Sequence, residues 1–447
     1  MNTKKGSARS TKHTLSLLFA TLIGSAGVFA LAYFELPSLL SVTYSDPAVA
    51  STTASTASAK PEVPAVVHLP TPVPLKAIYM TQCVVGTPSF RDSLVRFIED
   101  TELNAVVIDI KDFSGGIAFP SDNPAFAWAV SKKCGAGDMA AFVKSLHEKD
   151  IYVIGRITVF QDPLYTARHP KQAVQKAGDG SSTELGTSVW KDYKGLSFVD
   201  VGARDFWDYI VELSKESYAI GFDELNYDYI RYPSDGPMSE AVYSLSDGNT
   251  KPEMLELFFQ YMTPQVRATG AVLSADLFGM TATNEDDLNI GQVLERALPY
   301  FDFVDPMVYP SHYPKNFHGY ANPNEHPYDI VRFAMDSAVA RATATTTTVA
   351  ALAHSPIMRA EVVPAHDGIA TTTRQVAVGV YEKQAYPTSK IRPWLQSFDY
   401  PVTYTKEMVA AQIQATLDAG LTSYLFWDAA NKYHALRQVL TATSTNL

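Results

Sequence analysis

The chain has 447 residues, a hydrophobic fraction of 46% and a formal net charge of −11. This acidic balance excludes a nucleic-acid surface of the usual kind, which would need a basic patch. The length exceeds that of an average domain but suits one barrel of alternating strands and helices, since such barrels run from about 250 to more than 400 residues.

The N-terminus joins a basic tail, residues 1–13, to an uncharged and mostly apolar stretch, residues 14–34. About 20 apolar residues span a bilayer, and basic flanks stay on the cytoplasmic side. The length of the stretch favours a single-pass anchor in the cell membrane, with the rest of the chain outside the cytoplasm. The small residues at 30–32 also fit a signal-peptidase site, and cleavage there would leave a secreted protein.

Residues 41–74 are rich in Ser, Thr, Ala and Pro and predict an extended linker rather than a core. The folded domain is expected over 75–443. Cys83 and Cys134 are the only cysteines; in an exported protein they can pair, but their spacing does not show whether their Cα atoms come close enough. Two cysteines without CxxC or histidine spacing do not make a zinc site.

Short apolar runs alternate with amphipathic stretches from Leu75 to the C-terminus. Eight runs are predicted as strands: 77–80, 105–111, 151–159, 221–230, 272–278, 302–309, 390–396 and 421–427. Helices are predicted between and after them at 90–101, 138–149, 204–219, 253–269, 286–298, 325–340, 406–419 and 431–441. Strict alternation favours an α/β fold of the parallel (β/α)8 TIM-barrel class over a doubly wound sheet.

Two connections are too long to be plain loops and are predicted as insertions. Residues 160–203 have room for an extra hairpin, and residues 341–389 contain a Val-rich segment that is predicted to be partly strand. No role follows from the sequence for the second insertion.

Polar residues gather at the C-terminal ends of the predicted strands, where barrels of this class carry their catalytic groups. The candidate site residues are Asp109, Lys111, Arg156, Asn226, Asp228, Arg231, Asp276, Asp305, Tyr309 and Trp427. Because side chains alternate along a strand, Glu224, Asn226 and Asp228 share one face. Asp223 faces the other way, which indicates a structural role.

Two carboxyl groups that flank a glycosidic bond can hydrolyse it, one as proton donor and the other as nucleophile or base. Asp228 and Asp276 are the predicted catalytic pair, because the ends of adjacent parallel strands lie close together. Asp228 is assigned as nucleophile or base; Glu224 or Asp305 could replace Asp276 as the acid. The other eight candidates are predicted to bind substrate. Aromatic rings near the same rim could stack on the apolar faces of sugars; they are Phe160, Trp190, Tyr232, Tyr309, Tyr313 and Trp427.

Other interpretations of the same residues stay open. An aspartate at a strand end often caps a helix or a turn. Clustered carboxylates also suit Mg²⁺ or Ca²⁺, but no calcium-loop spacing is present, so neither a metal nor another cofactor is predicted. A non-catalytic carbohydrate-binding barrel tethered to the membrane and a metal-assisted hydrolase or lyase are the alternatives to a glycosidase.

Several motifs resemble those of the putative glycosyl hydrolase domain family, which is related to amylase-like barrels. They include AVVIDIKDFSGGIAFPSD (105–122), IYVIGRITVFQD (151–162), WKDYKG (190–195), GFDELNYDYIRYP (221–233), SADLFGMT (274–281), FVDPMVYPSHY (303–313) and GLTSYLFWDAANKY (420–433). The resemblance covers residues from about 75 to 435. It implies a barrel glycosidase. Together with the N-terminal anchor or signal, this predicts an enzyme acting on an extracytoplasmic polysaccharide.

The resemblance to amylase-like barrels implies a nucleophile on the fourth strand, Asp228, and an acid on the fifth, where Asp276 replaces the usual Glu and reaches less far. The fourth strand also resembles the DxxDxDxE strand of chitinase-type glycosidases. Asp223, Asn226 and Asp228 fall on its Asp positions, but Ile230 stands in place of its acid. That departure argues against substrate-assisted chitinase chemistry.

Overall fold

The computed structural model describes residues 66–178, 181–363 and 372–444. The predicted anchor at 14–34 and most of the predicted linker lie outside this part of the chain. Within it, no helix is both long enough and apolar enough to cross a membrane.

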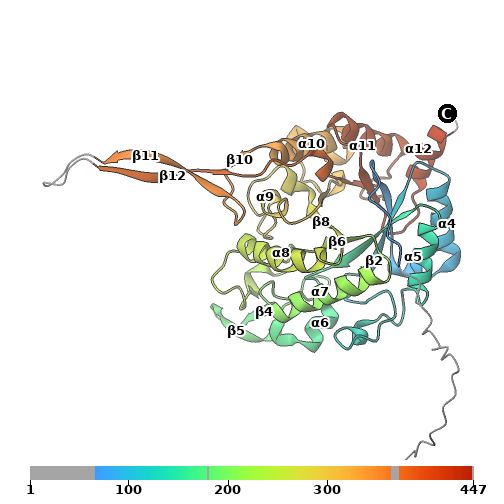
Figure 1. The fold of residues 1–447 in the computed structure, drawn as a ribbon, viewed down its shortest axis with the longest axis horizontal. Coiled ribbons are helices and arrows are strands. Elements are labelled where there is room, and N and C mark those ends of the chain that lie inside the picture. Colours follow the sequence, from blue (N-terminus) through green and yellow to red (C-terminus); the bar gives the residue numbers. More distant parts are fainter. Residues whose placement is uncertain (1–65, 179–180, 364–371, 445–447) are drawn as a thin grey trace, which may run out of the picture. The chain divides into compact units, whose positions relative to one another are not determined.

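Eight parallel strands close into a barrel, in the order β1-β14-β13-β9-β8-β6-β3-β2 (Figure 1). They are β1 (Lys76–Met80), β2 (Ala105–Lys111), β3 (Tyr152–Thr158), β6 (Glu224–Asp228), β8 (Val272–Phe278), β9 (Phe303–Met307), β13 (Trp394–Gln396) and β14 (Tyr424–Trp427). Each corresponds to one predicted strand, so the barrel is confirmed. β2 and β8 have the predicted bounds, whereas β6 is shorter than the run 221–230. It ends at Asp228, because Tyr229 adopts a positive φ of 51° and leaves the strand.

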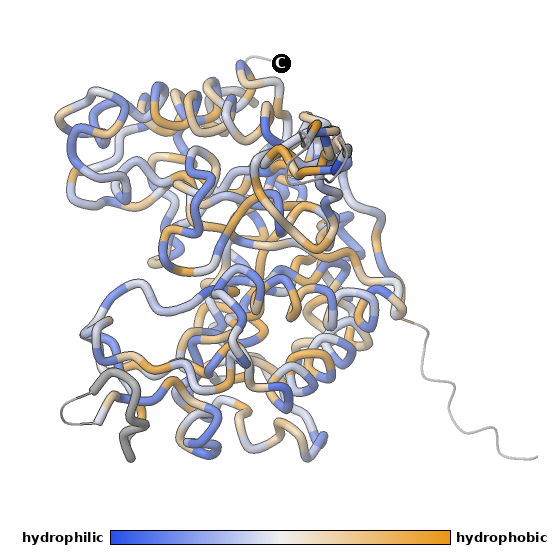
Figure 2. The backbone as a smooth tube through the Cα atoms, turned by 90° about the vertical axis from the view of Figure 1, so that its left-hand side faces the viewer, coloured by the Kyte–Doolittle hydropathy of each residue, from blue (hydrophilic) through white to orange (hydrophobic). Residues whose placement is uncertain are grey.

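Helices cover the outside of the barrel. The longer ones are α4 (Pro88–Glu99), α5 (Met139–His147), α7 (Arg204–Ala219), α8 (Lys251–Arg267), α10 (Pro327–Thr343), α11 (Lys406–Asp418) and α12 (His434–Ser444). Helix α7 buries Phe206, Ile210 and Leu213, which recur at helical spacing on one face. The same alternation of hydrophobic and hydrophilic residues is visible along the outer helices in Figure 2.

The predicted helix at 286–298 is wrong for most of its length, since only α9 (Leu294–Ala297) forms. Asp287 accepts hydrogen bonds from the backbone N–H groups of Asn289 and Gly291, and Leu288 and Asn289 both have a positive φ. Turn formation by Asp, Asn and Gly therefore outweighs the apolar spacing that suggested a helix.

The two insertions each form a small antiparallel sheet. In the first, β4 (Gln175–Gly178) pairs with β5 (Ser181–Val189) and with β7 (Ala241–Val242), so the region does contain a hairpin. In the second, β12 (Thr372–Glu382) pairs with β10 (Thr346–Thr347) and β11 (Ser355–Val363). The β11–β12 hairpin projects away from the barrel (Figure 1).

A disulfide and a buried carboxylate link segments around the barrel. Cys83, in the short helix α3 (Gln82–Val85), forms a disulfide with Cys134, with their Cα atoms 4.3 Å apart. The carboxylate of Asp223 accepts hydrogen bonds from the backbone N–H groups of Leu69, at 2.7 Å, and Val153, at 2.8 Å. Asp223 therefore ties the segment before β1 to β3, the structural role that its strand parity indicated.

Candidate active site

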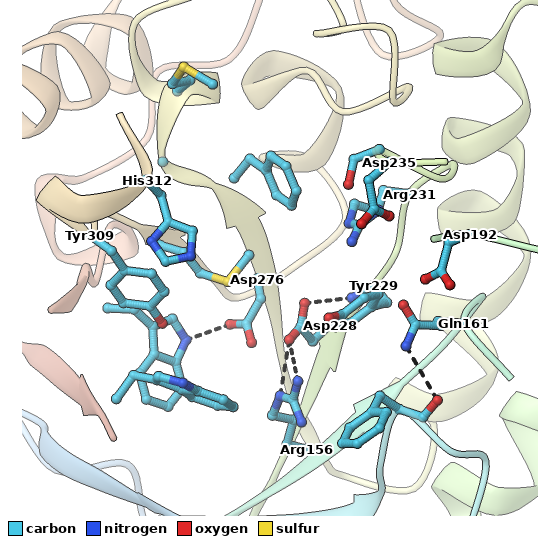
Figure 3. A pocket seen from close by; sticks show the side chains of 18 of the residues that line it. Arg156, Gln161, Asp192, Asp228, Tyr229, Arg231, Asp235, Asp276, Tyr309 and His312 are labelled. Atoms are coloured by element: carbon cyan, nitrogen blue, oxygen red, sulfur yellow. Dashed lines mark hydrogen bonds and ion pairs between the residues drawn. The ribbon is translucent and has the colours of Figure 1, made fainter. Parts of the chain in front are cut away.

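A cavity of about 570 Å³ opens at the C-terminal ends of the barrel strands, and both Asp228 and Asp276 line it (Figure 3). β6 and β8 pair with Asn226 beside Ser274 and Tyr227 beside Ala275. The next position along each strand therefore sets Asp228 beside Asp276. The register brings the predicted pair to one place on the cavity wall.

Asp228 is held by hydrogen-bond donors on both carboxyl oxygens. Its Oδ2 accepts from Arg156 Nη2 at 2.5 Å and from Nε at 3.1 Å, and its Oδ1 accepts from the backbone N–H of Tyr229 at 2.6 Å. A guanidinium that binds through two nitrogens fixes both the charge and the orientation of a carboxylate. Asp228 is therefore set as an oriented anion that faces the cavity.

Asp276 has the opposite environment. Burial raises the pKa of its carboxyl well above the usual range, and the nearby charges of Asp228 and Asp305 raise it further. Its Oδ1 accepts hydrogen bonds from Trp394 Nε1 at 2.7 Å and Asn226 Nδ2 at 2.9 Å. Because two donors bind Oδ1, a proton on this carboxyl group would lie on Oδ2.

Asp109 supports Arg156 from beneath the cavity. It is buried, accepts from Arg156 Nη1 at 2.6 Å and from the hydroxyl of Tyr79 at 2.5 Å, and is not part of the cavity wall. Burial raises the pKa of Asp109, an effect that the charge of Arg156 opposes. Asp109 thus orients the arginine that orients Asp228, and the structure does not place it where it was predicted to bind substrate.

A second buried ion cluster lies deeper, around Arg392. This guanidinium donates to both oxygens of Asp305 at 2.9 Å and to Glu224 at 2.5 Å. Burial raises the pKa of Asp305 to about 6. Neither carboxylate lines the cavity, so neither replaces Asp276 as the acid, and Asp305 is not placed to bind substrate.

Asn226 and Lys111 also lie off the cavity wall. Asn226 is fully buried and holds Asp276 through the hydrogen bond from its amide. Lys111 is fully buried, forms an ion pair with Asp162 at 2.9 Å and donates to the carbonyl of Thr158 at 2.5 Å. Strand alternation alone could not separate these buried groups from those facing the cavity, because both kinds lie at strand ends.

The remaining candidates do line the cavity. The guanidinium of Arg231 lies over the rings of Tyr229, at 4.5 Å, and Phe278, at 4.8 Å. Trp427 stacks on Tyr79 with ring centroids 3.8 Å apart, and Tyr309 also contributes to the wall. Of the other aromatic residues expected near the rim, Tyr313 lines the cavity; Phe160, Trp190 and Tyr232 are buried elsewhere.

Several cavity residues were not among the sequence-based candidates. Trp394 is the most consequential, since its indole N–H binds Asp276. It lies on a predicted strand, and a tryptophan there that needs a hydrogen-bond partner was an available signal. Loop residues that were also missed are Gln161, Asp192, Lys194 and Asp235.

Among the described residues, no group of three or more His, Cys, Asp or Glu side chains is arranged to hold a metal ion. The carboxyl groups of the site are instead bound by arginine, tryptophan and asparagine side chains.

A closed parallel barrel with carboxyl groups at adjacent strand ends is an arrangement typical of barrel glycosidases. The sequence profile of the putative glycosyl hydrolase domain family matches residues 77–360 and 361–433, and the chain belongs to that family. No curated protein matches the chain significantly.

The chain is similar to several solved structures. A hypothetical protein from Ruminiclostridium thermocellum ATCC 27405 is 30% identical, with 48% of this chain and 98% of that one covered and a TM-score of 0.39. The PgaB (BpsB) glycoside hydrolase domain from Bordetella bronchiseptica is 14% identical, with 83% and 99% covered and a TM-score of 0.49. The spore cortex-lytic enzyme SleL from Bacillus megaterium QM B1551 is 10% identical, with 82% and 74% covered and a TM-score of 0.41.

Proposed function

We propose that this protein hydrolyses glycosidic bonds of a polysaccharide, with Asp228 as the nucleophile and Asp276 as the general acid. The observation that carries the proposal is the contrast between two neighbouring carboxyl groups in one cavity. Arg156 and a backbone N–H bind Asp228 as an anion, whereas burial raises the pKa of Asp276 and keeps its proton in place. Paired groups with opposed environments are how one site supplies both roles.

In the first step, Asp276 gives its Oδ2 proton to the glycosidic oxygen as the bond from that oxygen to the anomeric carbon breaks. Asp228 attacks the same carbon and forms a glycosyl ester. In the second step, the Asp276 carboxylate takes a proton from water, the resulting hydroxide attacks the anomeric carbon, and Asp228 leaves as a carboxylate. Both groups return to their starting protonation states.

The strand register favours retention of configuration. Adjacent strands lie about 4.7–4.9 Å apart, and Asp228 and Asp276 occupy the position next to the paired residues Tyr227 and Ala275. Retaining glycosidases have carboxyl groups about 5–5.5 Å apart, and inverting ones about 6.5–9.5 Å. The proximity of the two strand ends supports direct attack by Asp228.

We also propose that the barrel acts outside the cytoplasm, held by a membrane anchor at 14–34 or released by cleavage. The support is the apolar segment after a basic tail, together with the disulfide between Cys83 and Cys134, since disulfides persist in oxidising compartments. Alkaline phosphatase fused after residue 74 should be active in cells. An inactive fusion would contradict the proposed location.

The catalytic assignment is tested with Asp228→Asn. We expect this variant to lose all measurable hydrolysis of 4-nitrophenyl glycosides and soluble polysaccharides while keeping the wild-type unfolding temperature. Asp235→Asn is the matched control, because Asp235 is an exposed carboxylate on the same cavity wall. It should keep most of the turnover. Proton NMR of the first product formed should show retained anomeric configuration.

Undiminished turnover by Asp228→Asn would refute the nucleophile. Loss of activity in Asp235→Asn alone would move the acid to that residue. Polysaccharide binding without any cleavage by the wild type would instead support the non-catalytic carbohydrate-binding barrel.

A further inference from the structure

A second cavity, of about 1140 Å³, adjoins the first and lies over the loops that follow β13 and β14. The two cavities share Lys194, Tyr309, His312 and Trp427 on their walls. One site for a small ligand usually occupies about 300–1,000 Å³. The combined space therefore exceeds what a single sugar unit at the catalytic pair would need.

Two sets of contacting aromatic rings lie between the proposed acid and the outside. Trp394 binds Asp276 and meets Trp427 at 5.7 Å between centroids. Farther out, Tyr309 meets His312 at 5.4 Å, and His312 meets Tyr400 at 6.4 Å. Tyr400 is 59% exposed and lines the second cavity. Rings of this kind offer stacking surfaces to successive sugar units.

The second cavity lies on the acid's side of the catalytic pair. In Figure 3, Asp276 lies between Asp228 and the rings of Tyr309 and His312, which belong to both cavities. The acid protonates the leaving oxygen, so the second cavity faces the leaving-group part of the substrate.

The charges on the second cavity's wall balance. Three lysines and three carboxylates line it: Lys194, Lys406, Lys432, Asp399, Glu407 and Asp428. A polyanionic glycan would need an excess of basic groups. Balanced charges among hydroxyl and amide side chains suit the hydroxyl groups of neutral sugars.

We infer that the second cavity binds the leaving-group part of a neutral glycan chain. The inference rests on the proposed function and names its substrate class. The leaving-group sugars extend from Trp427 past Tyr309 and His312 to Tyr400.

The test compares Tyr400→Ala with wild type on two kinds of substrate. A 4-nitrophenyl monosaccharide places no sugar in the second cavity, whereas β-glucan, xylan, mannan and galactan do. We expect Tyr400→Ala to lower kcat/KM on the polysaccharide that the wild type cleaves best by about 5- to 10-fold, the usual size of one aromatic contact. Its kcat/KM on the aryl glycoside should stay within about twofold of wild type.

Tyr261→Ala is the matched control, since Tyr261 is an exposed tyrosine on α8 outside both cavities. This variant should leave kcat/KM unchanged on both the polysaccharide and the aryl glycoside. Thr403→Trp, which places a bulky ring in the second cavity, should lower kcat/KM on the polysaccharide and spare the aryl glycoside. Equal losses on both substrates, or no loss on the polysaccharide, would overturn the inference, as would faster cleavage of polygalacturonate than of every neutral polymer.

Affinity electrophoresis with the same polysaccharides gives a readout that is independent of catalysis. Weaker retention of Tyr400→Ala than of wild type supports glycan binding in the second cavity, even if no bond is cleaved; in that outcome only the proposed hydrolysis fails. Identical retention of the two proteins overturns glycan binding there, whatever the turnover.

Discussion

Asp228 and Asp276 are the same residue type on neighbouring strands, and their partners alone give them different chemistry. Asp228 meets a guanidinium and a backbone N–H, both of which favour an anion. Asp276 is buried beside other carboxylates, and its neutral donors, Trp394 and Asn226, compensate for burial only in part, so its pKa is raised. A difference of this kind is what acid catalysis at neutral pH requires.

Asp276→Asn is predicted to separate activity from stability. Turnover should fall by roughly 10²- to 10⁴-fold, the usual contribution of a general acid. The amide keeps the acceptor at Oδ1 and replaces the protonated Oδ2, so the fold should persist. Glycosides with a good leaving group, such as 2,4-dinitrophenol, should lose less than alkyl glycosides.

The stability of this variant should depend on pH in a defined direction. Because the folded pKa of Asp276 is raised, its favourable contribution is complete below the unfolded value of about 3.9 and is lost as the pH rises through the folded pKa. The amide that replaces this carboxyl in the variant does not titrate. Thermal unfolding of both proteins should be measured from about pH 4 to 8. The unfolding temperature of the variant should increase relative to that of the wild type as the pH rises. A difference that does not change with pH would contradict the buried, protonated Asp276.

At the scale of elements, the β11–β12 hairpin contrasts with the barrel strands. The barrel strands are nearly all buried, whereas Met358, Val362 and Val378 on the hairpin are 48%, 65% and 41% exposed. A two-stranded hairpin without a face to pack on adds little stability. None of the hairpin residues that the structure describes lines the active-site cavity.

Replacing residues 356–381 by Asn-Gly should therefore leave the enzyme intact. Ser355 and Glu382 already pair across the hairpin, so a two-residue turn can join them. We expect the free energy of unfolding to change by less than about 0.5 kcal/mol, with unchanged turnover of 4-nitrophenyl glycosides. Urea unfolding measures the free energy of unfolding, and steady-state kinetics measure the turnover. A large loss of stability would show that the hairpin supports the barrel.

At the scale of the whole molecule, the disulfide closes a loop between the first two strand–helix units. Cys83 and Cys134 are 51 positions apart, and closing a loop of that size restricts the unfolded chain by about 4 kcal/mol. The double variant Cys83→Ser/Cys134→Ser should unfold at lower urea concentration than wild type. Dithiothreitol should lower the midpoint of the wild type and leave that of the variant unchanged. Equal urea midpoints for the wild type and the double variant in oxidising buffer would contradict a stabilising role of the disulfide.

The sequence by itself determined the order of the eight barrel strands, since alternation of apolar runs and amphipathic stretches is a local property of the chain. The sequence also placed Asp228 and Asp276 at strand ends. The alternation of side chains along the strand assigned Asp223 to the face opposite Asp228. Local turn chemistry around Asp287 was present in the sequence as well, but the apolar spacing of the same segment suggested a helix instead.

Only the tertiary structure decided which polar groups at the strand ends face the cavity. Asp305 and Lys111 turn inward because Arg392 and Asp162, 87 and 51 positions away, bind them there. Trp394 reaches Asp276 from 118 positions away. The position of a buried charged group depends on the group that pairs with it. Packing across strands, rather than spacing along the chain, determines where that partner lies.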